Sequence, residues 1–190
     1  MTGIIILAAG ASQRLGQPKQ LLQLEQQTLL ERVIHTALNS NIGPVIVVLG
    51  ANAANIQPHI APLHINIVIN EKWAEGMGSS IAAGMQFLLR TYNNVSSTFL
   101  LVCDQPFIDS RLLHRMFATP SPIVACTYNK AIGTPVLFQQ AFFPALQALQ
   151  SPEGARKLLQ QYKDQVKTVD FPQGGIDIDT IGDYNALLSQ

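Results

Sequence analysis

The chain has 190 residues and a mass of 20.7 kDa, a length that suits one domain with a sizeable buried core. Apolar residues make up 47% of it and charged residues 13%, about half the usual share of ~25%, which excludes a disordered chain, a charged tail and a coiled coil. Twelve basic residues balance twelve acidic ones, so the net charge of zero gives no basic face for nucleic acid.

The cysteine and histidine positions predict neither a disulfide framework nor a structural zinc site. Cys103 and Cys126 form no CxxC pair, and the four histidines stand at no metal-ligand spacing. The longest apolar run near the N-terminus, residues 4–9, is too short for a signal peptide or a membrane span. We therefore expect a cytoplasmic protein without a membrane partner, folded as a single domain over residues 1–190.

Short apolar runs alternate with helical periodicity along the chain. Strands are predicted over residues 4–8, 45–49, 65–69, 98–103, 123–127 and 166–171. Helices are predicted from the capping-box pattern at Thr28 to residue 38, from Ser79 or Ser80 to residue 89, and over residues 141–149, 153–162 and 183–188. The glutamine-rich stretch 17–27 is interpreted as solvated loop and helix edge. The alternation implies an α/β fold with a mainly parallel sheet and helices on both faces.

Ligands of such sheets bind outside the carboxyl ends of the strands, and an unusual loop follows the first predicted strand. Residues 7–19 read LAAGASQRLGQPK, in which small residues let the backbone approach a ligand. Arg14 offers a bidentate fork and Lys19 a point charge, which both suit a polyphosphate. The loop matches neither the Walker pattern nor GxGxxG, because Leu15 stands where each needs a glycine. A polar connection with two solvated cations is the alternative.

Two further segments follow predicted strands. Residues 76–80, GMGSS, could present amides and hydroxyls to a base or ribose, or could form a glycine turn before a serine cap. Asp104 ends an apolar strand within the sequence CDQP, where a carboxylate is well placed for Mg²⁺ or could cap a proline turn. Later in the chain, Asp177 and Asp179 place two acids on one face of an extended segment, and either could be a second metal ligand.

Together these residues resemble the nucleotidyltransferases that open with LAAGxSxRxGxxK, a pattern that residues 7–19 match at every specified position. Within them, the segments GMGSS, DQP and DIDT (residues 177–180) look like the branch of molybdenum cofactor cytidylyltransferases. The resemblance covers residues 4–188. It implies a three-layer Rossmann-like nucleotidyltransferase fold, with CTP and a molybdopterin-type cofactor as small-molecule substrates. The products it implies are molybdopterin cytosine dinucleotide and pyrophosphate.

The resemblance also implies roles for particular residues. Arg14, Lys19 and Asp104 would be catalytic, with Arg14 on the β- and γ-phosphates and Lys19 on the α-phosphate and the nucleophile. Mg²⁺, or Mn²⁺ in its place, would be held by Asp104 with Asp177 or Asp179. The nucleotide would lie against six residues, namely Leu7, Ala8, Ala9, Gly10, Ser79 and Ser80.

Ala9 bears on the choice of nucleotide, because the related guanylyltransferases typically carry a glycine at this position. Its added Cβ would favour a pyrimidine over a larger purine. Two departures from the family concern the acceptor. The chain reads Gly133-Thr134-Pro135 where the family often has Gly-His-Pro, and residues 151–156 read SPEGAR where Gly-Asp-x-Gly-Ala-Arg is common.

Several alternatives remain open at this stage. A guanylyl or other nucleotidyl transfer to a different phosphorylated acceptor would use the same loop. A non-catalytic nucleotide-binding or cofactor-chaperone domain would not need Asp104. A Rossmann-type oxidoreductase would normally have the third glycine that is missing here. A molybdoenzyme or its chaperone is a further possible partner.

Overall fold

The computed structural model describes residues 1–149 and 154–189. Its main sheet has seven strands in the order β5-β4-β1-β6-β8-β7-β9. Their bounds are β1 Thr2–Ala8, β4 Val45–Leu49, β5 Asn66–Ile69, β6 Ser97–Val102, β7 Ile123–Tyr128, β8 Ala131–Gln139 and β9 Val166–Asp170. A separate short hairpin joins β2 Gln23–Leu24 to β3 Gln27–Thr28.

The sheet is mainly parallel, as the sequence predicts. Strand β1 pairs in parallel with both β4 and β6, β4 pairs so with β5, and β7 with β9. Among the described strands of this seven-stranded sheet, only β8 runs antiparallel to its neighbours, β6 and β7. All seven residues of β1 are buried, because this central strand is covered on both faces.

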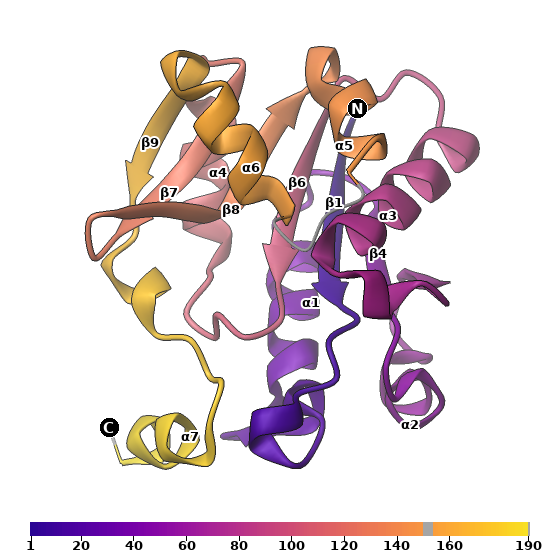
Figure 1. Cartoon of the computed structure of the whole chain (residues 1–190), viewed down its shortest axis with the longest axis vertical. Helices are drawn as coiled ribbons and strands as arrows, with labels where there is room; N and C mark the ends of the chain where they lie inside the picture. The colour runs from indigo at the N-terminus through magenta and orange to yellow at the C-terminus, as the bar shows by residue number, and fades with distance from the viewer. Residues whose placement is uncertain (150–153, 190) are drawn as a thin grey trace.

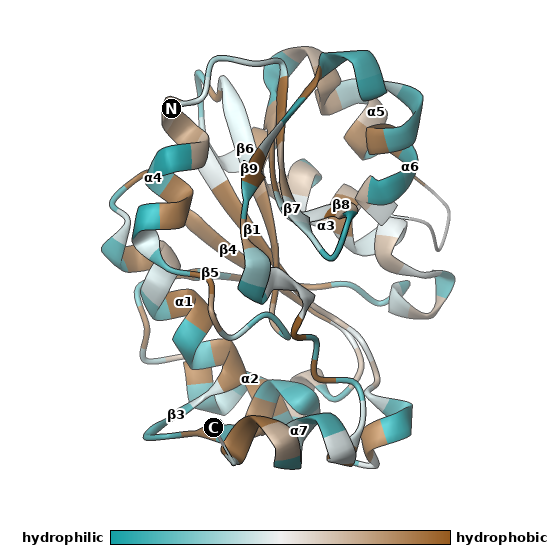
Figure 2. Cartoon of the chain, turned by 90° about the vertical axis from the view of Figure 1, so that its left-hand side faces the viewer, coloured by the Kyte–Doolittle hydropathy of each residue, from teal (hydrophilic) through white to brown (hydrophobic). Residues whose placement is uncertain are grey.

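Helices cover both faces of the sheet and produce three layers (Figure 2). One face packs against α1 Leu29–Asn39, α2 Ala53–Ile60 and α4 Ser110–Ala118. The other packs against α3 Met77–Thr91, α5 Phe143–Gln147 and α6 Gly154–Gln161. The predicted three-layer α/β architecture is therefore confirmed. None of the helices in residues 1–149 and 154–189 is long and apolar enough to cross a bilayer.

The C-terminal helix α7, Ile181–Leu188, lies apart from these layers and next to the loop that follows β1 (Figure 1). Leu187 and Ile178 join a small apolar cluster with Leu15 of that loop. The Tyr184 hydroxyl also donates a hydrogen bond of 2.6 Å to the carbonyl of Gln23. The C-terminal segment is thereby held across the carboxyl ends of β1 and β6.

The sequence does not predict helices α2 and α4, strand β8 or the two-residue strands β2 and β3, and one helix begins earlier than predicted. Pro58 weakens the helical pattern of α2, and Gly133 and Pro135 weaken the strand pattern of β8. Helix α3 begins at Met77 rather than at a serine cap. Its N-cap is Gly76, whose φ of 116° is a conformation that favours glycine.

The capping box at Thr28 is confirmed and gives a test of local stability. The Thr28 hydroxyl accepts a hydrogen bond from the Glu31 N–H at 3.2 Å, and the Glu31 carboxylate accepts one from the Thr28 N–H at 2.7 Å. Thr28→Ala should therefore lower the free energy of unfolding by about 1 kcal/mol and the melting temperature by roughly 2–4 °C. Thr28→Ser keeps the acceptor and should melt near wild type in the same thermal scan. Equal melting of the two variants would contradict the role of the cap.

Candidate active site

The loop after β1 forms one wall of a cavity of about 340 Å³. Ser12 and Gly16 have positive φ values of 54° and 70°, which turn the chain sharply before the short helix Lys19–Leu21. The Ser12 hydroxyl accepts a hydrogen bond from the Lys19 N–H at 3.0 Å, so the turn is closed onto that helix. The cavity is lined by Leu7, Ala8, Ala9, Gly10, Ala11, Lys19, Gln20, Trp73, Ala74, Gly76, Met77, Ser80, Val102, Cys103 and Asp104.

Lys19 and Asp104 meet at the edge of this cavity. Because β1 and β6 are parallel neighbours, their carboxyl ends lie together, and the segments that follow them are brought into contact. The Lys19 Nζ atom donates to the Asp104 carboxylate at 2.7 Å, and the two side chains are only 14% and 22% exposed. Burial opposes the charged form of Lys19, but Asp104 and the hydrogen bonds to both nearby acids outweigh it and raise the pKa of Lys19.

Asp179 connects the two cations of the loop from the C-terminal segment. Its Oδ1 atom accepts from Lys19 Nζ at 2.9 Å, and its Oδ2 atom accepts from Arg14 Nη2 at 2.7 Å. The hydrogen bond from Lys19 and the charges of both cations hold the pKa of Asp179 below its ordinary value. Arg14 is otherwise largely solvated, with 70% of its side chain exposed.

Asp177 stands apart from these ion pairs and makes no hydrogen bond with its side chain within the described residues. Partial burial, together with the neighbouring carboxylates of Asp104 and Asp179, raises its pKa to about 6. The three carboxylates of Asp104, Asp177 and Asp179 therefore outnumber the two cations, Lys19 and Arg14, by one.

Two carboxylates of the site fit a divalent metal ion. The described residues contain no group of three or more His, Cys, Asp or Glu side chains arranged as metal ligands. Asp104 and Asp177 nevertheless fit a Mg²⁺ ion that is bound mainly by nucleotide phosphates and water, because Mg²⁺ commonly takes only one or two carboxylates. Asp179 fits less well, since both of its oxygens are already paired with Arg14 and Lys19.

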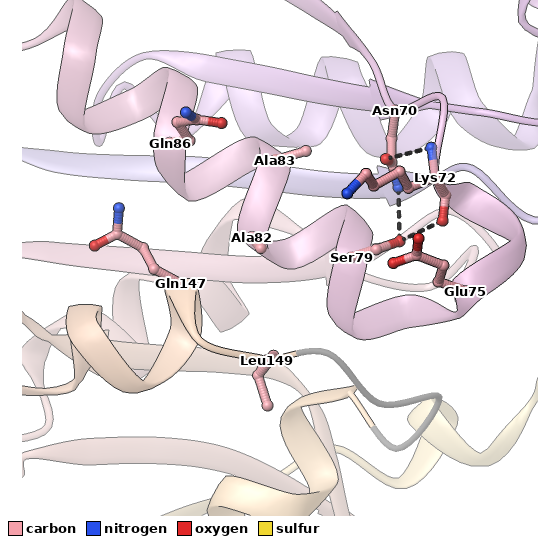
Figure 3. A pocket seen from close by; sticks show the side chains of 9 residues that line it. All are labelled: Asn70, Lys72, Glu75, Ser79, Ala82, Ala83, Gln86, Gln147 and Leu149. Carbon is pink, nitrogen blue, oxygen red and sulfur yellow. Dashed lines mark hydrogen bonds between the residues drawn. The ribbon is translucent and has the colours of Figure 1, made fainter.

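The two predicted serines lie on different sides of the turn before α3. Ser80 lines the loop cavity, but it is buried and its hydroxyl accepts from the Asn70 side chain at 3.0 Å. Ser79 lines a second, open cavity of about 800 Å³ between α3 and the end of α5 (Figure 3). Its hydroxyl is bonded to the carbonyls of Lys72 and Gly76, so it stabilises this turn. Ser79 thus lies in a different cavity from the loop residues, and its contact with a nucleotide stays a prediction.

Sequence reasoning missed two buried glutamines beside the charged residues. Gln20 and Gln105 are each 1% exposed, although the stretch around Gln20 was interpreted as solvated. The sequence signal that could have indicated them is their position, because each glutamine directly follows a charged motif residue, Lys19 or Asp104. Cys103 is a buried neighbour of Asp104, and burial raises the pKa of its thiol to about 12.

The segments that depart from the family are only partly described. Gly133, Thr134 and Pro135 lie on β8, and a Cβ added at Gly133 would meet the Tyr128 hydroxyl. Residues 151–153 lie outside the described part of the chain. Gly154 and Ala155, which follow them, begin α6 and are buried.

The fold and this site define an α/β protein with a cavity and paired charged residues at the carboxyl ends of β1 and β6, and comparisons with known proteins narrow the class. The family model of the MobA-like NTP transferase domain matches residues 4–166. This protein therefore belongs to the MobA-like NTP transferase family and is a nucleotidyltransferase related to those of the molybdenum cofactor.

Individual relatives carry different activities in their names. Nicotine blue oxidoreductase of Paenarthrobacter nicotinovorans is 32% identical, over 99% of this chain and 96% of the relative. The molybdenum cofactor cytidylyltransferase of Escherichia coli K12 is 26% identical, over 95% of this chain and 92% of the relative. The crystal structure of Rv0371c from Mycobacterium tuberculosis H37Rv is 27% identical with a TM-score of 0.86, over 100% of this chain and 98% of that one. A manganese complex of Rv0371c gives a TM-score of 0.81 at 26% identity, over the same shares of both chains.

Proposed function

We propose that this protein transfers a cytidylyl group from CTP to the terminal phosphate of a molybdopterin-type cofactor in the cytoplasm. The observation that carries the proposal is the meeting of Lys19, Asp104 and Asp179 beside the loop cavity, with Arg14 on the outer side. A cation and several carboxylates at one cavity mouth suit a triphosphate that binds together with a divalent metal ion. The similarity to the Escherichia coli cytidylyltransferase supports the choice of acceptor.

The proposed reaction needs no covalent intermediate on the protein. An oxygen of the acceptor phosphate forms a bond to the α-phosphorus of CTP, in line with the bond that breaks. The bond from the α-phosphorus to the oxygen bridging to the β-phosphate breaks, and pyrophosphate leaves with that electron pair. The protein's contribution is to position the two phosphates and to compensate their charge.

Lys19 and Arg14 make this contribution from opposite ends of the triphosphate. Lys19 is held by two acids and lies nearest the cavity, so it is placed for the α-phosphate and the incoming oxygen. Arg14 is exposed and suits the β- and γ-phosphates, which reach toward solvent. Asp104 and Asp177 would hold Mg²⁺ or Mn²⁺, which when bound compensates the charge that develops on the phosphate oxygens. The manganese complex of Rv0371c supports the use of a divalent ion.

CTP should be used well above GTP. Ala9 lines the cavity, and a Cβ added at Gly50 would meet both the Ala9 Cβ atom and Trp73. We propose that the Ala9 methyl group, which a glycine would lack, leaves less room for a purine at this wall. Ala9→Gly should raise the kcat/KM for GTP relative to CTP. Equal or greater turnover of GTP by the wild type would contradict the cytidylyl assignment but leave the transferase class intact.

A pyrophosphate-release assay with each of the four nucleoside triphosphates, with and without molybdopterin, tests the proposal as a whole. Release that requires both CTP and molybdopterin is the expected result. Release with CTP and a sugar phosphate, but not with molybdopterin, would keep the transfer reaction and change the acceptor. This comparison of acceptors is necessary because Thr134 stands where the family often has the histidine of Gly-His-Pro.

An oxidoreductase activity is the second candidate, because nicotine blue oxidoreductase shares more identity with this chain than the cytidylyltransferase does. The loop lacks the third glycine of GxGxxG, since Leu15 occupies that position. Reduced nicotinamide nucleotide with a quinonoid aromatic acceptor tests this candidate spectroscopically. Steady oxidation of the nicotinamide, without pyrophosphate release from any nucleoside triphosphate, would favour it over nucleotidyl transfer.

A further inference from the structure

Two buried side chains beside the charged residues of the site leave one polar atom each unpaired. Gln20 directly follows Lys19, and Gln105 directly follows Asp104. Within the described residues, the Oε1 atoms of these two glutamines are the buried side-chain atoms without a hydrogen-bond partner. Buried polar atoms are rarely left so, and each exception needs a physical reason.

The Gln20 carboxamide holds two carbonyls of the loop that follows β1. Its Nε2 atom donates to the carbonyl of Ala8 at 2.8 Å and to that of Gly10 at 3.0 Å. Both peptide bonds are trans, so their N–H groups, which belong to Ala9 and Ala11, point away from Gln20. The Ala9 carbonyl is also held, since it accepts from the Ala51 N–H at 3.0 Å. Three successive carbonyls are thus fixed, and with them the directions of the loop amides.

The unpaired oxygen follows from this arrangement. If the carboxamide were turned over, Oε1 would face the two carbonyl oxygens, and both hydrogen bonds would be lost. An aliphatic side chain of similar size would fill the same space without leaving an unpaired acceptor. A glutamine is therefore a poor choice for packing alone, and its two contacts with the loop carbonyls explain its presence.

Gln105 has the same kind of contact on the other side of the site. Its Nε2 atom donates to the carbonyl of Gly174 at 2.8 Å, in the turn Pro172–Gly175. This turn leads directly into the segment that carries Asp177 and Asp179. The Tyr128 hydroxyl interacts with the Gln105 carboxamide, but within the described residues Oε1 meets no hydrogen-bond partner of good geometry.

We propose that Gln20 and Gln105 are positioning residues: Gln20 orients the amides of the loop toward the nucleotide, and Gln105 fixes the C-terminal segment that carries the acids. The catalytic meaning of this proposal rests on the proposed nucleotidyl transfer. Gln20 lines the loop cavity, but in this proposal neither glutamine acts on the reacting atoms directly. Each acts through backbone carbonyls that lie beside a charged residue of the site.

The order of the unliganded protein tests the contacts without reference to activity. Amide ¹⁵N order parameters of Ala9, Gly10 and Ala11 should be about 0.85 in the wild type and fall to about 0.6 or below in Gln20→Met. Gln20→Asn keeps a carboxamide but withdraws it by one methylene, so it should give the same loss if the methionine variant does not fold. Gln105→Met should lower the order parameter of Asp177 and leave the loop unchanged. Unchanged order in the variants would overturn the proposal.

Steady-state kinetics with CTP and molybdopterin separate positioning from simple stabilisation. Gln20→Met should raise the KM for CTP about 10-fold, with kcat changed by less than roughly threefold, when assayed well below its melting temperature. Gln17→Met, at an exposed glutamine of the same loop, should match the wild type. A lower melting temperature with an unaltered KM would make Gln20 a structural residue only and overturn its role. A wild type that binds no nucleoside triphosphate would overturn the proposed function. The order parameters would still show whether the two glutamines hold the backbone segments that they contact.

Discussion

Lys19→Ala should lower the turnover of cytidylyl transfer by about 10²-fold or more, which corresponds to about 3 kcal/mol of activation free energy. The ammonium group is placed beside the cavity by Asp104 and Asp179, at 2.7 and 2.9 Å. Its charge matters most when the α-phosphorus is five-coordinate and negative charge accumulates on its oxygens. The measurement is pyrophosphate release at saturating CTP and acceptor, at a temperature well below melting.

Loss of Lys19 also leaves the acids of the cluster without their shared cation, so the variant should be less stable. Lys19→Ala combined with Asp179→Asn removes one of those negative charges and should recover part of the melting temperature without recovering turnover. Lys167→Ala, at an exposed lysine on β9, should match the wild type in both measurements. Recovery of turnover in the double variant would mean that Lys19 only compensates Asp179, which contradicts a role at the phosphate.

Arg14 gives a useful comparison with Lys19 in the same assay. It is exposed and, within the described residues, is ion-paired with one acid, Asp179, so its removal should disturb the folded protein little. Arg14→Lys keeps the charge but loses the bidentate fork, so the affinity for CTP should weaken. Near-normal kinetics of both the Arg14 and the Lys19 variants would mean that the loop binds something other than a triphosphate.

The central sheet could be predicted because its strands are continuous apolar runs, and β4 was predicted with its observed bounds. The loop of residues 7–19 could be found for a different reason. Its small residues and two cations would not stabilise a buried apolar core, so their position at the end of β1 indicates a different role. Strand β8 could not be found, since its antiparallel pairing depends on the two-residue turn Asn129–Lys130, in which both residues have positive φ.

The contacts within the site lie beyond what a single sequence reveals. Lys19 is 85 residues from Asp104 and 160 residues from Asp179, and only the fold brings them together. The sequence left Asp177 and Asp179 as equal candidates for a metal ion, because both follow the same alternation. The structure separates them, since Asp179 is paired with two cations and Asp177 is not. The burial of Gln20 likewise results from tertiary contacts with loop carbonyls.

Asp104→Asn should lower turnover by roughly 10²–10⁴-fold, the range for losing a major electrostatic element of an active site. The substitution keeps shape and volume but removes one negative ligand of the metal ion, so the charge on the α-phosphate oxygens is less well compensated. The asparagine carbonyl can still accept a hydrogen bond from Lys19, and Asp179 still compensates the charge of that lysine. The melting temperature should consequently change by only a few degrees.

Asp109→Asn is the matched control, five residues further along. Asp109 is the N-cap of α4 and accepts from the Leu112 N–H at 2.7 Å, a role that asparagine fills equally well. The control should therefore keep both turnover and melting temperature. The test measures, for both variants, pyrophosphate release over a range of Mg²⁺ concentrations and a melting curve. Retained turnover in Asp104→Asn would remove Asp104 from the site, and a wild type that needs no divalent ion would contradict the metal-dependent mechanism.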